Sequence, residues 1–209
     1  AAAWWLQPAK TDAGRTGLVQ RILFPVETNK LEPRRGVVLS ADGRVARALS
    51  HGEVVRSDDL GATWYRETPL DPDPDRVPRL WALAQSADGR RAIAVGIRGL
   101  IVAKDEDGGS WVERKSGVKW DFQGVVMSAD GQRAIAWDRD DRFLWTQDGG
   151  ITWAMQGAPP GTGASLAAEG LTGLLWGKGR LWRTTDGGTS WSDVTMQLDR
   201  EVYVQRGAI

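Results

Sequence analysis

The chain lacks cysteine, lacks a surplus of charge of either sign, and lacks any long apolar run. Without cysteine, disulfide bonds and thiolate chemistry are excluded. The 27 basic and 27 acidic side chains cancel, which argues against nucleic-acid binding, because affinity for a phosphate backbone needs an excess of Lys and Arg. No apolar segment approaches the ~20 residues that a membrane span requires. We therefore expect no nucleic-acid partner and no membrane span.

Histidine is also scarce, since His51 is the only one in the chain. Metal sites draw on several His, Cys or carboxylate ligands, and a histidine-based triad needs a positioned nucleophile. His51 is better interpreted as a turn residue, because histidine tolerates the special dihedral angles of turns. The sequence predicts no metal site and no cofactor.

Glycine and tryptophan, in contrast, are abundant. The chain has 26 glycines among 209 residues, and 12 of its aromatic residues are tryptophan. This composition favours short strands joined by tight turns, and no segment shows the sustained 3.6-residue period of a long amphipathic helix. We interpret residues 1–209 as a single all-β domain.

Two short motifs recur at a fixed separation. The first, called here the turn motif, is Ser-Ala-Asp-Gly at 40–43, 86–89 and 128–131, with a degenerate copy at 167–170. The second, called here the clip, follows Ser/Thr-x-Asp-x-Gly-x-x-Trp, and its tryptophan lies 24 or 25 residues after the start of a turn motif. The clip residues are Ser57, Asp59, Gly61 and Trp64, then Gly108 and Trp111, then Thr146, Asp148, Gly150 and Trp153, and finally Thr184, Asp186, Gly188 and Trp191.

The two motifs together delimit four repeats, at about 36–70, 79–117, 121–158 and 164–198. A constant distance inside each repeat, with variable spacing between repeats, is typical of four-stranded antiparallel meanders that form the blades of a β-propeller. The sequence therefore predicts an all-β propeller. Residues 1–35 and 199–209 are expected to supply flanking or closing strands, either as a fifth, split blade or as part of a larger propeller.

The clip has a local structural explanation. Its Asp accepts hydrogen bonds from backbone N–H groups ahead of it, its Gly permits positive φ, its Ser or Thr caps the loop, and its Trp anchors the next strand. The clip resembles the Asp-box, or bacterial neuraminidase repeat. The fuller strings at 143–150 and 180–188 are similar to those of photosystem II stability and assembly factor-like proteins. This resemblance covers about 36–198 and implies a propeller that binds a protein partner; the second repeat departs from it, with Glu106 in the Asp slot.

The Asp-box also occurs in sialidases and other glycosidases, so two enzymatic hypotheses follow from the resemblance. A sialidase needs a tyrosine nucleophile, but Tyr65 directly follows a clip tryptophan and Tyr203 lies near the end of the sequence, which disfavours that activity. A two-carboxylate glycosidase could draw on Asp121 and Asp138. The string Asp-Arg-Asp-Asp-Arg at 138–142 is better explained as a solvated turn with self-neutralising charges. We favour a non-catalytic protein.

Topology predicts where a ligand would bind. If each clip joins the third strand of a blade to the fourth, the loops between second and third strands and the blade connectors share the opposite side. The candidate contacts on that side are Arg98, Trp120, Asp121, Arg139, Arg142 and Arg180. Arginine and tryptophan are typical of binding hot spots, so we predict a scaffold for a protein partner. The alternative is a carbohydrate-binding lectin or glycoside hydrolase. The absence of cysteine is compatible with a periplasmic or extracellular location, without requiring one.

Overall fold

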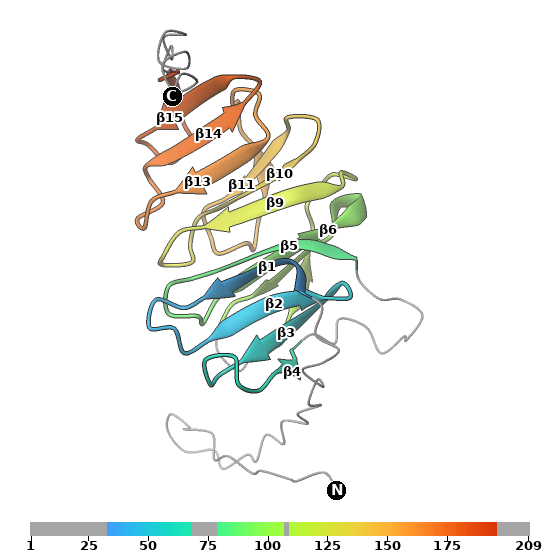
Figure 1. Cartoon of the computed structure of the whole chain (residues 1–209). Helices are drawn as coiled ribbons and strands as arrows, with labels where there is room; N and C mark the ends of the chain where they lie inside the picture. The colour runs from blue at the N-terminus through green and yellow to red at the C-terminus, as the bar shows by residue number, and fades with distance from the viewer. Residues whose placement is uncertain (1–32, 68–78, 107–108, 196–209) are drawn as a thin grey trace, which may run out of the picture.

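The computed structural model describes residues 33–67, 79–106 and 109–195. These residues form four antiparallel sheets of four strands, and each sheet contains four consecutive strands in chain order. The only helical element among them is a single 3-10 turn, η2 (Ile97–Gly99). Figure 1 shows the sheets stacked one after another, with the first and the last at opposite ends of the stack. The predicted all-β fold, with one four-stranded meander per repeat, is confirmed.

The strands are short, as the turn-rich sequence predicts. Sheet 1 contains β1 (Pro33–Leu39), β2 (Ala46–Ser50), β3 (Glu53–Ser57) and β4 (Tyr65–Arg66). Sheet 2 contains β5 (Leu80–Gln85), β6 (Ala92–Gly96), β7 (Ile101–Lys104) and β8 (Val112–Arg114). Sheet 3 contains β9 (Phe122–Met127), β10 (Ala134–Asp138), β11 (Phe143–Thr146) and β12 (Ala154–Met155). Sheet 4 contains β13 (Gly163–Leu166), β14 (Gly173–Gly177), β15 (Arg180–Thr184) and β16 (Ser192–Asp193).

Alternating side chains pack each inner sheet between its two neighbours. In β6, Ile93 and Val95 belong to the core shared with sheet 3, whereas Ala92 and Ala94 belong to the core shared with sheet 1. All four side chains are completely buried. Because the side chains of a strand point alternately to its two faces, a strand between two sheets is apolar on both. We call the interfaces between successive sheets seams 1–2, 2–3 and 3–4.

Tryptophan fills the seam between sheets 3 and 4. Trp145 and Trp182 are both buried there, and the ring centroids of Trp145 and Trp191 lie 5.6 Å apart. Trp137 covers Gly124 on the neighbouring strand so closely that a Cβ at Gly124 would lie 2.0 Å from the indole ring. These large rings therefore fill the space between the two blades.

The turn motifs connect the first and second strands of each sheet and also join the sheets to one another. Inside the first copy, the Ser40 hydroxyl donates to Asp42 at 2.6 Å and accepts the amide of Val45 at 2.9 Å. Backbone hydrogen bonds then link successive copies: Ala41 N to Ala87 O (2.6 Å), Ala87 N to Ala129 O (2.8 Å) and Ala129 N to Ala168 O (2.8 Å). The small alanine of the motif allows these turns to approach closely.

The clips join the third strand to the fourth in all four sheets. In the first clip, Ser57 Oγ accepts the amide of Gly61 at 2.8 Å, Asp59 accepts the amide of Thr63 at 2.8 Å, and Trp64 Nε1 donates to Gly61 O. The corresponding hydrogen bonds recur in the third and fourth clips, around Thr146, Asp148, Gly150 and Trp153, and around Thr184, Asp186, Gly188 and Trp191. The hydroxyl and amide of Thr63, with the Ser57 hydroxyl, lower the pKa of Asp59.

The second clip is built differently. Lys104 stands in its Ser/Thr slot, and the Lys104 ammonium donates to the carbonyl of Gly109. Gly108, the predicted clip glycine, lies outside the described residues. Trp111 is buried in seam 1–2.

The flanking segments were predicted at 1–35 and 199–209. Residues 33–35 belong to β1, whereas 1–32 and 199–209 lie outside the described residues, so a fifth blade remains a prediction. No helix in the described part of the chain has the length and apolar character to cross a membrane.

Candidate functional site

Four loops and connectors come together on the side opposite the clips. The 3-10 turn η2 contacts the next connector, because Gly99 N donates to Trp120 O at 2.6 Å and Arg98 N donates to Asp121 Oδ1 at 2.8 Å. The connector in turn contacts the following loop through Trp120 and Arg142. We call the surface formed by residues 97–99, 116–121, 138–142 and 177–180 the loop face.

Trp120 is the aromatic centre of the loop face. Its ring is partly buried against the core of seam 2–3 and meets Phe122 edge to face, with 6.4 Å between the ring centroids. The guanidinium carbon of Arg142 lies 4.5 Å from the centroid of the Trp120 ring, within the range of a cation–π interaction. Trp120 is thus half-buried and fixed in place, with Arg142 stacked over it.

Both oxygens of the Asp138 carboxylate accept hydrogen bonds from its own loop. It is buried, its Oδ1 accepts the amides of Asp140 at 2.9 Å and Arg142 at 3.0 Å, and its Oδ2 accepts Arg142 Nε at 2.6 Å. Arg142 also pairs with Asp140 at 2.8 Å. Asp138 therefore orients Arg142 over Trp120, and the string at 138–142 is a turn whose charges pair internally.

The other predicted arginines divide into paired and free. Arg180 pairs with Asp193 on the outer strand β16 at 2.9 Å. Arg98 and Arg139 are exposed, and within the described residues neither guanidinium has a hydrogen bond or an ion pair. Lys178, which the sequence analysis did not single out, forms an ion pair with Asp141 of the neighbouring loop.

The tips of the loop face and of the equivalent loop of sheet 1 adopt an unusual backbone conformation. One residue in each loop between the second and third strands has positive φ without being glycine: His51 (53°), Arg98 (54°), Asp141 (63°) and Lys178 (50°). A side chain with a Cβ pays on the order of 1 kcal/mol for this conformation, which Gly and Asn adopt most easily. The chain therefore holds four charged or titratable side chains at loop tips in spite of a conformational cost.

The tyrosines and the acidic side chains form no catalytic or metal-binding group within the described residues. Tyr65 lies on the outermost strand of sheet 1, and its hydroxyl donates to Asp58 at 2.6 Å. Tyr203 lies outside the described residues. The described part of the chain contains no group of three or more His, Asp or Glu side chains arranged to hold a metal ion.

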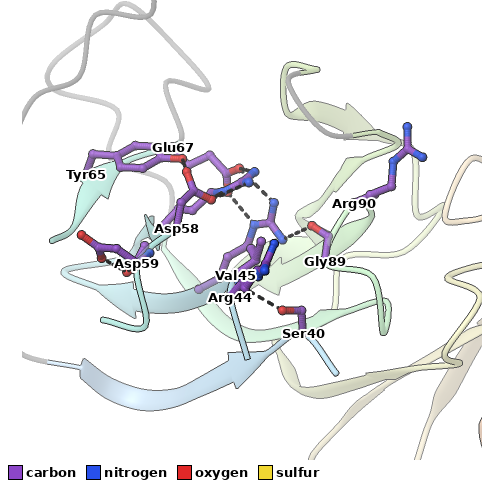
Figure 2. A network of polar contacts seen from close by, with 12 residues as sticks. Ser40, Arg44, Val45, Asp58, Asp59, Tyr65, Glu67, Gly89 and Arg90 are labelled. Atoms are coloured by element: carbon purple, nitrogen blue, oxygen red, sulfur yellow. Dashed lines mark hydrogen bonds and ion pairs between the residues drawn. The ribbon is translucent and has the colours of Figure 1, made fainter. Parts of the chain in front are cut away.

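A second charged cluster is buried in seam 1–2 and was not anticipated from the sequence. The Glu67 carboxylate accepts Arg47 Nε at 2.7 Å and Arg47 Nη2 at 3.0 Å, and it pairs with Arg56 at 3.2 Å and Lys104 at 3.4 Å. The Arg47 side chain has no exposed surface, and the other three are at least nine-tenths buried. Figure 2 shows the Glu67 carboxylate within this network, near Gly89 of sheet 2. Arg47 Nη1 donates to the Gly89 carbonyl at 2.7 Å.

Electrostatics explain how this cluster tolerates burial. Burial alone would raise the pKa of Glu67, but the hydrogen bonds and charge of Arg47, with the charges of Lys104 and Arg56, lower it to about 2. Burial lowers the pKa of Lys104, and the charge of Glu67 opposes that change. Every charged group has partners inside the seam. We therefore assign the cluster a structural role: it joins sheets 1 and 2 by ion pairs, where the other seams are joined by apolar side chains.

Comparison with known proteins supports the architecture only. No protein-family model matches the chain, and no curated protein sequence matches it. Among solved structures, it is similar to the GH74 xyloglucanase of Xanthomonas campestris (TM-score 0.62, 17% identity, covering 78% of this chain and 30% of that one). It is also similar to the β-propeller domain of Cps50 (Swd1) from Myceliophteria thermophila (TM-score 0.61, 13% identity, covering 83% of this chain and 57% of that one). A third neighbour is YCF48 bound to a D1 peptide (TM-score 0.55, 16% identity, covering 78% of this chain and 56% of that one).

These neighbours show the fold, and each of them is longer than this chain. The chain spans between about a third and three fifths of the length of these three structures, and 24% of another GH74 enzyme, from Niastella koreensis. Sequence identity below 20% in all three carries fold information and no information about activity. The described residues are thus four blades of a β-propeller.

Proposed function

We propose that the protein is a non-catalytic propeller scaffold that binds a protein partner through its loop face. The observation that carries the proposal is the pair of exposed guanidinium groups of Arg98 and Arg139, on two loops that both contact Trp120. Two-residue hairpin turns require positive φ at their tips, so the informative feature is the charged side chain at a position that Gly and Asn fill most easily. Loops on a rigid scaffold are also where binding residues are most often found.

The chemistry of the loop face suits an acidic protein segment with an apolar anchor. Arg98 and Arg139 offer exposed guanidinium groups without internal partners, and a guanidinium binds carboxylates through two parallel hydrogen bonds. Trp120 is already ordered by Arg142 and Phe122, so binding to it costs little conformational entropy. Ordered tryptophan and arginine dominate the energy of many protein interfaces.

Hydrolysis of glycosides is less well supported by the same residues. A general acid or base must reach the substrate with a free carboxyl oxygen. Both oxygens of Asp138 accept hydrogen bonds from its own loop. One oxygen of Asp121 accepts the amide of Arg98. Asp121 keeps one oxygen without a hydrogen bond, but Asp138 keeps none, so the pair of free carboxylates that the two-carboxylate hypothesis requires is incomplete.

The finer assignment is to the Asp-box propellers, and within them to proteins like photosystem II assembly factors. The hydrogen bonds of the first, third and fourth clips support the assignment to Asp-box propellers, because they satisfy the polar groups of the motif locally. The structural neighbour YCF48 is bound to a D1 peptide, which supports peptide recognition as the mode of binding for this chain.

The proposal is tested by a pair of matched variants. Arg98→Asn with Arg139→Asn removes the two free guanidinium groups and relieves the backbone at position 98. Arg44→Asn with Arg90→Asn removes two exposed arginines from the turn motifs on the clip side. Proteins captured from the source organism's lysate by the immobilised wild type should be lost with the first variant and retained with the second, by quantitative mass spectrometry.

Two results would overturn the proposal. One is equal capture by both double variants, because the loop face would then be irrelevant to the partner. The other is reproducible binding on a glycan array that Asp121→Asn abolishes, because the surface would then be directed at carbohydrate. Urea unfolding should show both double variants folded, with the Arg98 variant as stable as the wild type or more so.

A further inference from the structure

A row of three planar side chains runs from the core of seam 2–3 to the surface of the loop face. Phe122 is completely buried, Trp120 is half-buried, and the Arg142 side chain is 43% exposed. Phe122 meets the Trp120 ring edge to face, and the guanidinium carbon of Arg142 lies 4.5 Å from the centroid of the same ring. Because exposure increases along the row, Arg142 is its outermost member.

The Arg142 guanidinium is held along one edge and stacked on one face. Its Nε donates to Asp138 Oδ2 at 2.6 Å, and its Nη2 pairs with Asp140 at 2.8 Å. The Asp138 side chain is only 2% exposed, so this contact is shielded from water. Nη1 has no hydrogen bond within the described residues. One face of the guanidinium lies on Trp120, and the exposed surface of Arg142 leaves the other face for a ligand.

Free cations lie on both sides of this row. Arg98 and Arg139 are exposed, and neither guanidinium has a partner within the described residues. Arg98 belongs to η2, which reaches the connector through the hydrogen bond from Gly99 N to Trp120 O. Arg139 belongs to the loop that carries Arg142. Trp120 therefore lies between two loops, each of which holds a free guanidinium.

The exposed charges of the described residues are separated between the two sides of the sheets, although the formal net charge of the chain is zero. Two carboxylates are exposed on the loop face, against six cations: Arg98, Lys119, Arg139, Arg142, Lys178 and Arg180. On the opposite side, every copy of the turn motif exposes a carboxylate, at Asp42, Asp88, Asp130 and Glu169. A separation of this kind directs a negatively charged ligand to the loop face and away from the turn motifs.

We propose that the loop face recognises an acidic peptide segment by stacking an aromatic side chain of that segment on the exposed face of Arg142, while Arg98 and Arg139 bind carboxylates on either side of the ring. The inference rests on the proposed function and names its ligand class: acidic residues that flank an aromatic one. A guanidinium suits both contacts, because it binds aromatic rings on its faces and carboxylates at its edge.

The arrangement makes the site selective for an aromatic anchor. Asp138 and Asp140 fix the Arg142 guanidinium before a ligand arrives, so stacking on it costs little side-chain entropy. A leucine in the ligand makes the apolar contact but lacks the ring quadrupole that attracts a cation. Aromatic and aliphatic anchors of the same acidic segment should therefore bind with different affinities.

Fluorescence anisotropy with labelled synthetic peptides tests the inference on the chain of 209 residues. The probes are Gly-Asp-Glu-Trp-Glu-Asp-Gly, the same peptide with Leu in place of Trp, and the same peptide with Asn and Gln in place of its acidic residues. The wild type should bind the Trp peptide about 2- to 5-fold more tightly than the Leu peptide, as expected for an exposed cation–π contact. Equal affinity for the Trp and Leu peptides, equal affinity for the acidic and neutral peptides, or no binding at all would overturn the inference.

Two matched arginine variants locate the aromatic contact. Arg142→Lys keeps the charge but loses the planar surface, and it should reduce the preference for the Trp peptide to less than about 2-fold. Arg180→Lys is the control, because Arg180 is an exposed arginine of the same face that is paired with Asp193; it should leave the preference unchanged. Urea unfolding verifies that both variants are folded, and Arg142→Gln repeats the measurement if Arg142→Lys is not. A preference that survives replacement of Arg142, or that Arg180→Lys reduces equally, would overturn the inference.

Failure of this inference and failure of the proposed function give different results. If capture from the lysate depends on Arg98 and Arg139 but the peptides bind without preference for an aromatic residue, the loop face binds a partner and the aromatic contact is wrong. If capture does not depend on these two arginines, the proposed function itself is wrong.

Discussion

Replacing Glu67 by glutamine should destabilise the protein severely, because it removes the one carboxylate that faces three buried cations. Arg47, Arg56 and Lys104 would remain in seam 1–2 with no counter-charge from Glu67. Removing one member of a buried ion pair typically costs about 3–5 kcal/mol, since it leaves uncompensated charge away from water. We expect a loss of that size at pH 7.

The pKa of Glu67 gives an independent magnitude and a pH window. Folding lowers the pKa of this carboxyl from 4.5 to about 2, which corresponds to about 3 kcal/mol of stability. Because the folded-state pKa lies below the unfolded one, this contribution is complete above pH 4.5 and is lost as the pH falls toward 2. The difference in stability between the wild type and Glu67→Gln should therefore shrink over that interval.

Urea unfolding followed by tryptophan fluorescence, at several pH values between 7 and 2, measures both quantities. Glu113→Gln on the exposed strand β8 is the control and should change the free energy of unfolding by less than about 0.5 kcal/mol. A loss below about 1 kcal/mol for Glu67→Gln, or a loss that does not depend on pH, would refute the ionic account of this seam.

Two further substitutions test the packing of the blades and the clips. Gly124→Ala should cost about 1–3 kcal/mol, because the added Cβ would overlap the Trp137 ring; urea unfolding measures the loss, and a neutral result would contradict the close contact. Asp148→Ala should cost about 1–2 kcal/mol by removing the acceptor for the amide and hydroxyl of Thr152. The control Asp140→Ala, at an exposed turn position, should cost less. Equal losses in thermal unfolding would contradict the structural role of the clip.

The sequence predicted the strands and their order because both depend on local chemistry. Turn motifs and clips fix where each strand begins and ends, and consecutive strands joined by tight turns pair as neighbours. The recurrence of the motifs at constant spacing therefore carried the architecture. The same reasoning placed Arg98, Trp120, Asp121 and Arg142 in contact-forming loops on one side.

The seams could not be predicted in this way, because they depend on which side chain of one sheet meets which side chain of the next. Arg47 and Arg56 were missed, although one signal was available in the alignment of repeats. Arg47 occupies the position of Ile93, and Lys104 replaces the Ser or Thr of the clip in the next repeat. Two charged residues at otherwise apolar or hydroxyl positions, in adjacent repeats, indicate an ionic seam.

Ion pairing within the string at 138–142 was anticipated from the sequence as self-neutralising charge, whereas the pair of Arg180 with Asp193 was not. Arg142 and Arg180 were expected to contact a partner, but nearby carboxylates of Asp138 and Asp193 hold them. Positive φ at Arg98 and Lys178 is also a property of the folded loop, since charged residues are not the usual choice for such turns. The residues of the proposed binding surface were named from the sequence, but the structure was needed to separate the free guanidinium groups of Arg98 and Arg139 from the paired ones.

Site-specific photo-cross-linking in cells of the source organism tests the proposed binding surface most directly. A photoreactive amino acid placed at position 139, on the loop face, should yield a discrete adduct with a protein partner. The same group at position 44, which is equally exposed on the clip side, should not. Adducts of the same partner from both positions, or from position 44 alone, would contradict the account.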